Sequence, residues 1–165
     1  MPLEHLMKST PYNFATMPTK RMAAGAIFLN AAGNILLVKP TYRPDWLIPG
    51  GTIEAGESPS DACRREIKEE LDLDISCDKL LCIEYLSASA PQTESVHFVF
   101  YGGILTMTQI QQIVLPPSEL SNCHFSPIEE ALTLLGSRLA RRVPHCLQAL
   151  QEECIIYLED GRRIC

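Results

Sequence analysis

Three carboxylates recur at helical spacing between residues 66 and 70. Glu66, Glu69 and Glu70 are three and four positions apart, and residues at these spacings are neighbours on a helix surface. Like charges in this arrangement destabilise a helix by about 0.2–0.5 kcal/mol per pair, so an opposing charge is needed. A hard divalent cation with oxygen ligands would supply it, and the structural alternative is a solvated acidic face.

The residues around the carboxylates predict the helix that positions them. A glycine-rich turn at 49–51 leads to Ser58, a good N-cap, and to Pro59 at the first helical position. The same segment carries a separate apolar stripe, which predicts that the helix packs on a core through that side. The stripe consists of Cys63, Ile67 and Leu71.

The wider pattern, GTIEAGESPSDACRREIKEELDL at residues 51–73, resembles the Nudix box. The matching positions are Gly51, Glu57, Arg65, Glu66, Ile67, Glu69, Glu70 and Leu73. The family usually has a helix-ending glycine where this chain has Asp72. Aspartate tolerates the left-handed conformation better than most residues, so we expect a small stability cost and no loss of chemistry. The preceding segment, WLIPGG from Trp46, fits the family's usual approach to the box.

The resemblance implies a set of metal ligands. Glu66, Glu69 and Glu70, together with the backbone carbonyl of Gly50, would hold the metal, which is expected to be Mg²⁺ or Mn²⁺. Divalent ions lower the pKa of bound water and neutralise charge that develops on phosphoryl oxygens. Glu66 and Glu70 are therefore also expected to be catalytic.

Further roles follow from the same resemblance. Arg65 is expected to pair with Glu57 and to orient the carboxylates, with Gly51 as a supporting residue. The structural alternatives are an exposed helix arginine and a helix-start glutamate favoured by the helix dipole. Family members often add an acid from a later loop, as a ligand or as the base. Glu119 is the candidate here, Glu94 is its competitor, and a plain surface role for Glu119 stays open.

Phosphate contacts require cations near the mouth of the site. Lys39, at the end of a predicted strand, and Arg43, in the loop before Gly50, are the candidates because their chain positions lead to the box. Tyr42 and Phe14 are weighed as base-stacking residues, although packing is the better interpretation of each.

The function implied is hydrolysis of the pyrophosphate bond of a nucleoside diphosphate linked to another moiety. A nucleoside triphosphate, an ADP-ribose-like compound and a dinucleoside polyphosphate all remain open as substrates. The alternative is a catalytically idle Nudix fold that binds a nucleotide or a protein; such modules typically lose box acids, and here all are present. Prenyl diphosphate isomerase chemistry on the same fold ranks lower, because the cysteines lack a recognisable isomerase context.

Composition sets the broader limits. A chain of 165 residues predicts one domain, and a net charge of −6 without a basic run argues against a nucleic-acid surface. No apolar run is long enough to span a bilayer, and the N-terminus lacks a signal-peptide core, so we expect a cytoplasmic protein without a membrane partner. Seven scattered cysteines favour small buried hydrophobes over disulfides or a zinc site. The resemblance permits a homodimer.

The periodicity of the remaining chain predicts an α/β fold. Strands are expected at 22–29 and 35–39 as a hairpin, at 75–86 and 96–105 as an antiparallel pair, and at 155–158. Helices are expected from Pro127 and over 138–151, the second interrupted near Pro144, while 113–125 stays ambiguous. The resemblance sharpens this to a Nudix α/β/α sandwich with a mixed sheet, as a single domain over 21–165 after an N-terminal arm over 1–20.

Overall fold

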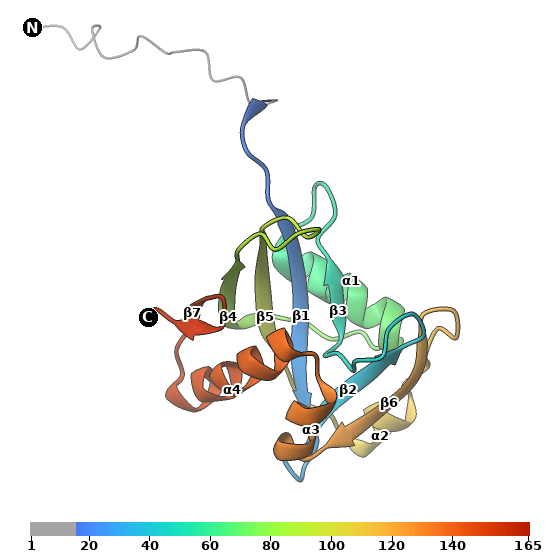
Figure 1. Cartoon of the computed structure of the whole chain (residues 1–165). Helices are drawn as coiled ribbons and strands as arrows, with labels where there is room; N and C mark the ends of the chain where they lie inside the picture. Colours follow the sequence, from blue (N-terminus) through green and yellow to red (C-terminus); the bar gives the residue numbers. More distant parts are fainter. Residues whose placement is uncertain (1–15) are drawn as a thin grey trace, which may run out of the picture.

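A computed structural model describes residues 16–165 and places a mixed β-sheet between helices (Figure 1). The strands are β1 (Arg21–Leu29), β2 (Ile35–Pro40), β3 (Gly50–Thr52), β4 (Lys79–Leu86), β5 (Ser95–Ile104), β6 (Leu120–Ser126), β7 (Ile156–Glu159) and β8 (Arg162–Arg163). The helices are α1 (Pro59–Leu71), α2 (Met107–Gln111), α3 (Ile128–Leu134) and α4 (Ser137–Glu152). Helix α1 packs on one face of the sheet, and α3 and α4 pack on the other, which confirms the predicted α/β/α sandwich.

Strand β1 joins the two halves of the sheet. The strand order is β6-β2-β1-β5-β4-β7-β8, and β3 pairs with β1 outside this order. The β1–β5 and β4–β7 pairs are parallel, whereas the other strand pairs are antiparallel, so the sheet is mixed. The predicted hairpin is confirmed by the antiparallel pairing of Leu29 with Ile35, and the predicted antiparallel pair is formed by β4 and β5.

Helix α1 begins and ends where the local sequence predicts. The Ser58 hydroxyl accepts a hydrogen bond from the backbone N–H of Asp61 at 3.2 Å, and Pro59 takes the first helical position. At the other end Asp72 adopts a left-handed conformation with φ of 56°, and its N–H donates to the Lys68 carbonyl. Asp72 therefore takes the place of the usual glycine, and its carboxylate also pairs with the Lys68 ammonium at 2.5 Å.

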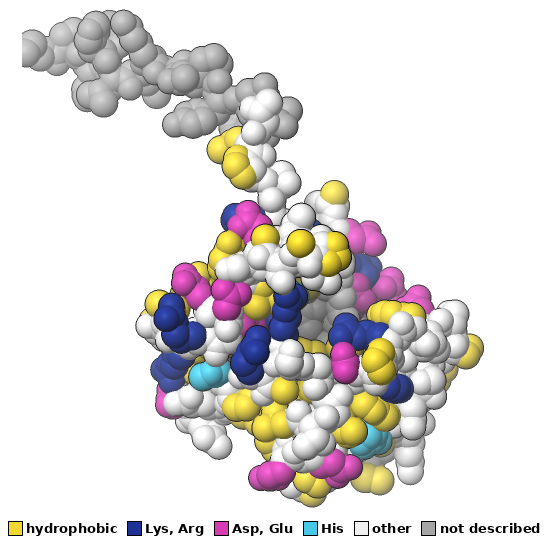
Figure 2. Space-filling model, in the orientation of Figure 1, with side chains coloured by type: hydrophobic (Ala, Val, Ile, Leu, Met, Phe, Trp, Pro, Cys, Tyr) yellow, Lys and Arg dark blue, Asp and Glu magenta, His cyan; other side chains and the backbone are white. Residues whose placement is uncertain are grey.

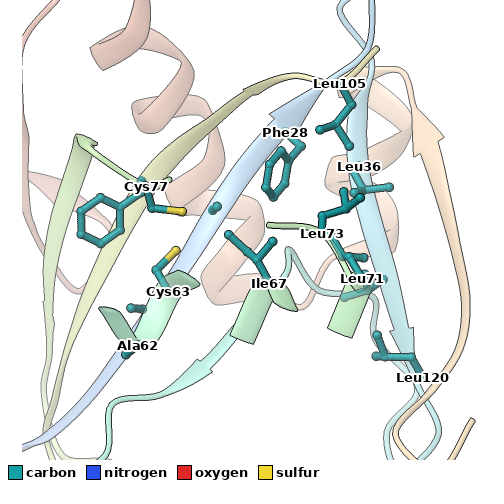
Figure 3. Packing of buried hydrophobic residues seen from close by; sticks show 14 of the residues in the cluster. Phe28, Leu36, Ala62, Cys63, Ile67, Leu71, Leu73, Cys77, Leu105 and Leu120 are labelled. Atoms are coloured by element: carbon teal, nitrogen blue, oxygen red, sulfur yellow. The ribbon is translucent and has the colours of Figure 1, made fainter. Parts of the chain in front are cut away.

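Alternating residues of β1 supply two separate cores. Ala24, Ala26 and Phe28 pack on the α1 side, while Ile27 packs on the α3 and α4 side, because successive side chains of a strand point to opposite faces. The apolar stripe of α1 lies fully buried against the first of these cores (Figure 3). Burial of one large apolar side chain contributes about 1.5–3 kcal/mol, so this contact fixes how α1 lies on the sheet. Its carboxylate stripe is thereby held at a defined place.

The cysteines follow the predicted pattern in part. Cys63, Cys77, Cys82 and Cys146 are buried and act as small apolar residues, whereas Cys165 is exposed. All the cysteines in the described part of the chain are free thiols. Within residues 16–165 no helix has both the length and the apolar character needed to cross a bilayer.

Helix α4 differs from the sequence prediction at Pro144. The helix continues from Ser137 to Glu152 through the proline, so the predicted interruption near that residue is wrong. Proline removes one helical hydrogen bond. Burial of Val143, Cys146 and Ala149 against the sheet offsets that cost, because packing of an amphipathic face supplies most helical stability in proteins.

Three short elements are not predicted by the sequence pattern. Strands β3 and β8 have three and two residues and α2 has five, too few for a hydrophobic period to appear. The ambiguous region 113–125 resolves into a loop and strand β6, which pairs only with β2 at the edge of the sheet. Of the predicted arm, residues 1–15 lie outside the described residues, and its boundary with the domain stays a prediction.

Candidate active site

Two glycines of β3 lie directly against the carboxylates of α1. The N–H of Gly50 donates to Oε2 of Glu70 at 2.8 Å. A Cβ at Gly51 would lie 2.4 Å from Cδ of Glu66, which is too short for non-bonded atoms. Gly50 itself has φ of 142°, and a Cβ there would lie 2.4 Å from the Ala24 carbonyl oxygen, so only glycine fits. The glycines thus allow two carboxylates to pack against strand β3.

Arg65 connects three carboxylates and the backbone of β3. Its Nε donates to Glu57 Oε1 at 2.7 Å, and Nη1 donates to Glu66 Oε1 and Glu69 Oε2, both at 2.9 Å. Nη2 reaches Glu57 Oε2 and the Thr52 carbonyl, both at 3.0 Å. These contacts lower the pKa of the Glu57 carboxyl to about 2 and raise the pKa of Arg65. Arg65 therefore has the partner that the resemblance implies and is not a free surface arginine.

Glu70 is the most deeply buried of the three stripe carboxylates, with 8% of its surface exposed. Burial raises the pKa of Glu70 to about 8, although the Gly50 N–H favours the charged form. Repulsion from Glu66, Glu119 and Glu69 raises this pKa further. Burial also raises the pKa of Glu66, where the Arg65 contact opposes the shift. Burial and the neighbouring carboxylates therefore favour the neutral form of Glu70 up to about pH 8.

Of the two later acids, Glu119 is the one near the carboxylates. Its charge raises the pKa values of both Glu66 and Glu70, and its carbonyl accepts from the Thr41 N–H at 2.8 Å. Glu94 instead accepts from Lys20 at 2.5 Å and from the Tyr85 hydroxyl at 2.7 Å. The surroundings therefore favour Glu119 over its competitor.

A cavity of about 540 Å³ opens beside Gly50 and Gly51. Strands β1 and β5, the loop before β3 and the first turns of α4 line it, and Figure 2 shows Lys and Arg side chains bordering the hollow. The volume falls within the range of small-molecule sites. Its arginines are Arg21, Arg43, Arg138 and Arg142.

Only one of the two predicted phosphate-binding cations lines this cavity. Arg43 lies at its wall, where it pairs with Asp45 at 3.0 Å. Lys39 is absent from the lining: its ammonium donates to the Pro44 carbonyl and lies 5.8 Å from the centroid of the Trp46 ring. The Trp46 contact and the backbone bond hold the Lys39 side chain against the loop that follows β2.

Of the two residues weighed for base stacking, only Tyr42 lies in the described part of the chain. Tyr42 is 75% exposed, so the preferred packing interpretation is wrong for it, and it is not among the lining residues. Phe14 lies outside the described residues.

The sequence analysis does not predict the residues that line the cavity at the end away from Gly50. Arg142 is 4% exposed and donates from Nε to Glu84, itself 1% exposed. His97 lies nearby, with Nε2 3.0 Å from the Ser95 hydroxyl. The available signal was a charge at a buried position in each of two amphipathic segments, β4 and α4, since such charges are usually paired.

The carboxylates fit a divalent cation by chemistry, since Mg²⁺ and Ca²⁺ prefer oxygen ligands. The high pKa of Glu70 supports this fit, because a cation beside it would stabilise the charged form. Among residues 16–165, however, no three His, Cys, Asp or Glu side chains are arranged as a ready metal-binding group. Arg65 engages Glu66 and Glu69, and Gly50 engages Glu70, so cation binding requires these contacts to rearrange.

Comparison with known proteins gives an independent assignment. The NUDIX domain family model matches residues 19–146. The 8-oxo-dGDP phosphatase of Homo sapiens is 37% identical over 87 residues, covering 48% of this chain and 25% of that protein. Nudix hydrolase 5 of Arabidopsis thaliana is 31% identical over 125 residues, covering 70% of this chain and 40% of that protein. The chain thus spans between a quarter and two fifths of the length of these relatives.

The fold agrees with the sequence comparison. The solved MutT protein of Methanosarcina mazei Go1 has a TM-score of 0.65 and 18% identity, covering 83% of this chain and 99% of that one. At this identity the likeness shows the fold alone. The family match covers most of the chain, including the carboxylate helix and the cavity-lining strands β1 and β5. The chain belongs to the Nudix family.

Proposed function

We propose that this chain hydrolyses the pyrophosphate bond of a nucleoside diphosphate linked to another moiety. The observation that carries the proposal is Glu70, a buried carboxyl with a pKa raised to about 8, held against Gly50 beside an arginine-lined cavity. A carboxyl whose pKa is strongly shifted by burial beside a cavity is a candidate for a functional residue. Nucleoside triphosphates, ADP-ribose-like compounds and dinucleoside polyphosphates are the substrate types considered.

Mg²⁺ or Mn²⁺ is proposed as the cofactor, with Glu66, Glu69, Glu70 and the Gly50 carbonyl as ligands. When bound, such an ion supplies acidified water and neutralises charge on the phosphoryl oxygens. Arg65 orients Glu66 and Glu69 through the bonds described above, which is a positioning role.

The remaining residues divide between proton transfer and substrate binding. Glu119 is proposed to accept a proton near Glu66 and Glu70, which is supported by the effect of its charge on the pKa values of both. Arg43 is proposed to contact the substrate at the cavity wall. The cavity itself has room for the part of the substrate that lies beyond the diphosphate.

The test is phosphate release, measured with a coupled phosphatase, in Mg²⁺ and then in Mn²⁺. The panel contains nucleoside triphosphates, ADP-ribose, nucleotide sugars and dinucleoside polyphosphates, and 8-oxo-dGDP is added because a relative is named for it. Glu70→Gln should lower turnover by orders of magnitude. Glu130→Gln, an exposed change on α3, serves as the matched control and should match the parent.

Strong turnover of one compound that disappears in Glu70→Gln supports the proposal and names the substrate type. Equal turnover by parent and Glu70→Gln would remove Glu70 from the site. Silence across the whole panel, with cation binding intact, would favour the alternative of a Nudix fold that binds a nucleotide or a protein without hydrolysing it.

A further inference from the structure

The cavity has two chemically different ends. At one end lie Gly50 and Gly51, against which the carboxylates of Glu70 and Glu66 pack. At the other end, three of the four arginines gather around His97. Burial and the charges of these arginines lower the pKa of His97 to about 3, so the imidazole is neutral at physiological pH. The three arginines are Arg142, Arg138 and Arg21.

Strand register gives the separation of the two ends. Glu84 of β4 pairs with His97 of β5, His97 pairs with Ala23 of β1, and Ala23 pairs with Thr52 of β3. Neighbouring strands lie about 4.8 Å apart, so three spacings place Glu84 about 14 Å across the sheet from β3. Because Arg142 pairs with Glu84, its end of the cavity lies well beyond the reach of a diphosphate held at β3.

The arginines at the far end also differ in how their charge is compensated. Arg142 is neutralised by Glu84. Arg21 donates to the Thr93 hydroxyl and carbonyl, both at 2.9 Å, which position the guanidinium without neutralising it. The Arg138 side chain makes neither a hydrogen bond nor an ion pair within residues 16–165, although its charge helps to lower the pKa of Asp160. Arg21 makes no ion pair in the same part of the chain. Two guanidinium groups without a direct ion-pair partner among the described residues thus lie at one end of the cavity, in a chain whose net charge is −6.

Helix and strand geometry bring these two charges together. Arg138 and Arg142 are four positions apart on α4, so they are neighbours on its surface. Arg21 of β1 pairs with Ser95 of β5, two positions before the pair formed by Ala23 and His97. Residues two apart on a strand point to the same face, so Arg21 lies on the same face of the sheet as His97. Guanidinium groups bind phosphate and carboxylate through paired hydrogen bonds.

We propose that Arg21 and Arg138 bind an anionic group on the part of the substrate that lies away from the diphosphate. The preferred substrate then carries a phosphomonoester or a carboxylate on the moiety attached to the nucleoside diphosphate. This inference rests on the proposed function for the position of the diphosphate. The bond to Glu84 fixes the Arg142 guanidinium beside this site, and the neutral His97 adds no charge to it.

The test is binding, measured by isothermal titration calorimetry in EDTA so that hydrolysis does not intervene. Two matched ligand pairs separate the two anion types: ADP-ribose against ADP-ribose 1″-phosphate, whose extra phosphate is on the attached ribose, and UDP-glucose against UDP-glucuronate. In at least one pair the charged member should bind about 10-fold tighter or more, the factor that corresponds to about 1.4 kcal/mol. The difference should shrink as salt is raised, because ions screen exposed charges.

Arg138→Gln should reduce the affinity ratio of that pair to less than about 3-fold, well below the 10-fold expected of the parent. Arg141→Gln is the matched control, because Arg141 is another exposed arginine of α4 but is outside the cavity lining, and it should preserve the ratio. Circular dichroism checks that both variants are folded. Ratios near one for both pairs in the parent, no measurable binding of any of the four ligands, or a ratio unchanged in Arg138→Gln would each overturn the inference.

Hydrolysis in Mg²⁺ is then measured on the same four compounds. A charge preference in binding without turnover of any compound would leave the anion site standing and count against the proposed function. Turnover without a charge preference in binding would support the proposed function and count against the anion site.

Discussion

Replacing Glu70 by glutamine should stabilise the metal-free protein at neutral pH. The folded state keeps a proton on Glu70 up to about pH 8, whereas the unfolded state releases it near the ordinary value of 4.5. In this window the folded state binds more protons, so the free energy of unfolding falls as pH rises from 4.5 to 8. Glutamine is uncharged at every pH, and its carbonyl can still accept the Gly50 N–H.

The expected size follows from linkage. Each pH unit within the window costs about 1.4 kcal/mol, so at pH 7 the parent has lost on the order of 3 kcal/mol relative to pH 4.5. Parent and Glu70→Gln should therefore have similar free energies of unfolding at pH 4.5, and the variant should gain an advantage of that order by pH 7. Such a gain from removing a proposed catalytic group indicates stability given up for function.

The assay is urea unfolding in EDTA at several pH values between 4.5 and 8, followed by the fluorescence of Trp46, the single tryptophan. Glu130→Gln is the matched control: it makes the same substitution at an exposed position on α3, away from Glu70. Its free energy relative to the parent should change little with pH. A difference between parent and Glu70→Gln that stays constant across the window would refute the burial argument.

Further predictions concern the glycine contact, the buried ion pair, the helix end and metal binding. Gly51→Ala should displace the Glu66 side chain and lower turnover at least about 10-fold, while circular dichroism shows an unchanged fold, because the clash is with a movable side chain. Arg142→Met should cost about 3–5 kcal/mol in urea unfolding by leaving Glu84 buried without its partner, and adding Glu84→Gln should recover part of that loss. Asp72→Gly should raise the free energy of unfolding by about 0.5–1 kcal/mol, since glycine adopts a φ of 56° without strain; a drop would mean that the Lys68 contact matters more. Mg²⁺ at 100 times its dissociation constant should stabilise the folded parent by about 2.7 kcal/mol and thereby raise its melting temperature. No shift of the melting temperature at millimolar Mg²⁺ would count against a metal site.

Local signals in the sequence predict the carboxylate helix well. Ser58, Pro59 and Asp72 act within one turn of the helix ends, so the bounds of α1 follow from neighbouring residues alone. The Glu57 partner of Arg65 is also close in sequence, and the motif resemblance supplies it. The strands of the two antiparallel pairs are likewise visible in the apolar pattern, within a few residues of their ends.

Features that depend on distant parts of the chain are not predicted. Arg21 and Arg138 come from β1 and α4, and only the strand order and the packing of α4 bring them to one cavity. Lys39 illustrates the opposite error, since closeness along the chain to the box does not place its side chain in the cavity. Pro144 shows that packing of a helix against the sheet can override a local helix breaker.

The position of β1 also has a consequence for how the chain is made. Met22 pairs with Val96, so the parallel partner of β1 is synthesised more than 70 residues after it. At about 5–20 residues per second, β1 emerges roughly 4–15 s before β5 can join it. During that interval β1 and β2 have only a two-stranded hairpin, which is marginally stable in water. The apolar centre of the finished sheet is therefore exposed on the nascent chain, where chaperones and low growth temperature would improve the yield of folded protein.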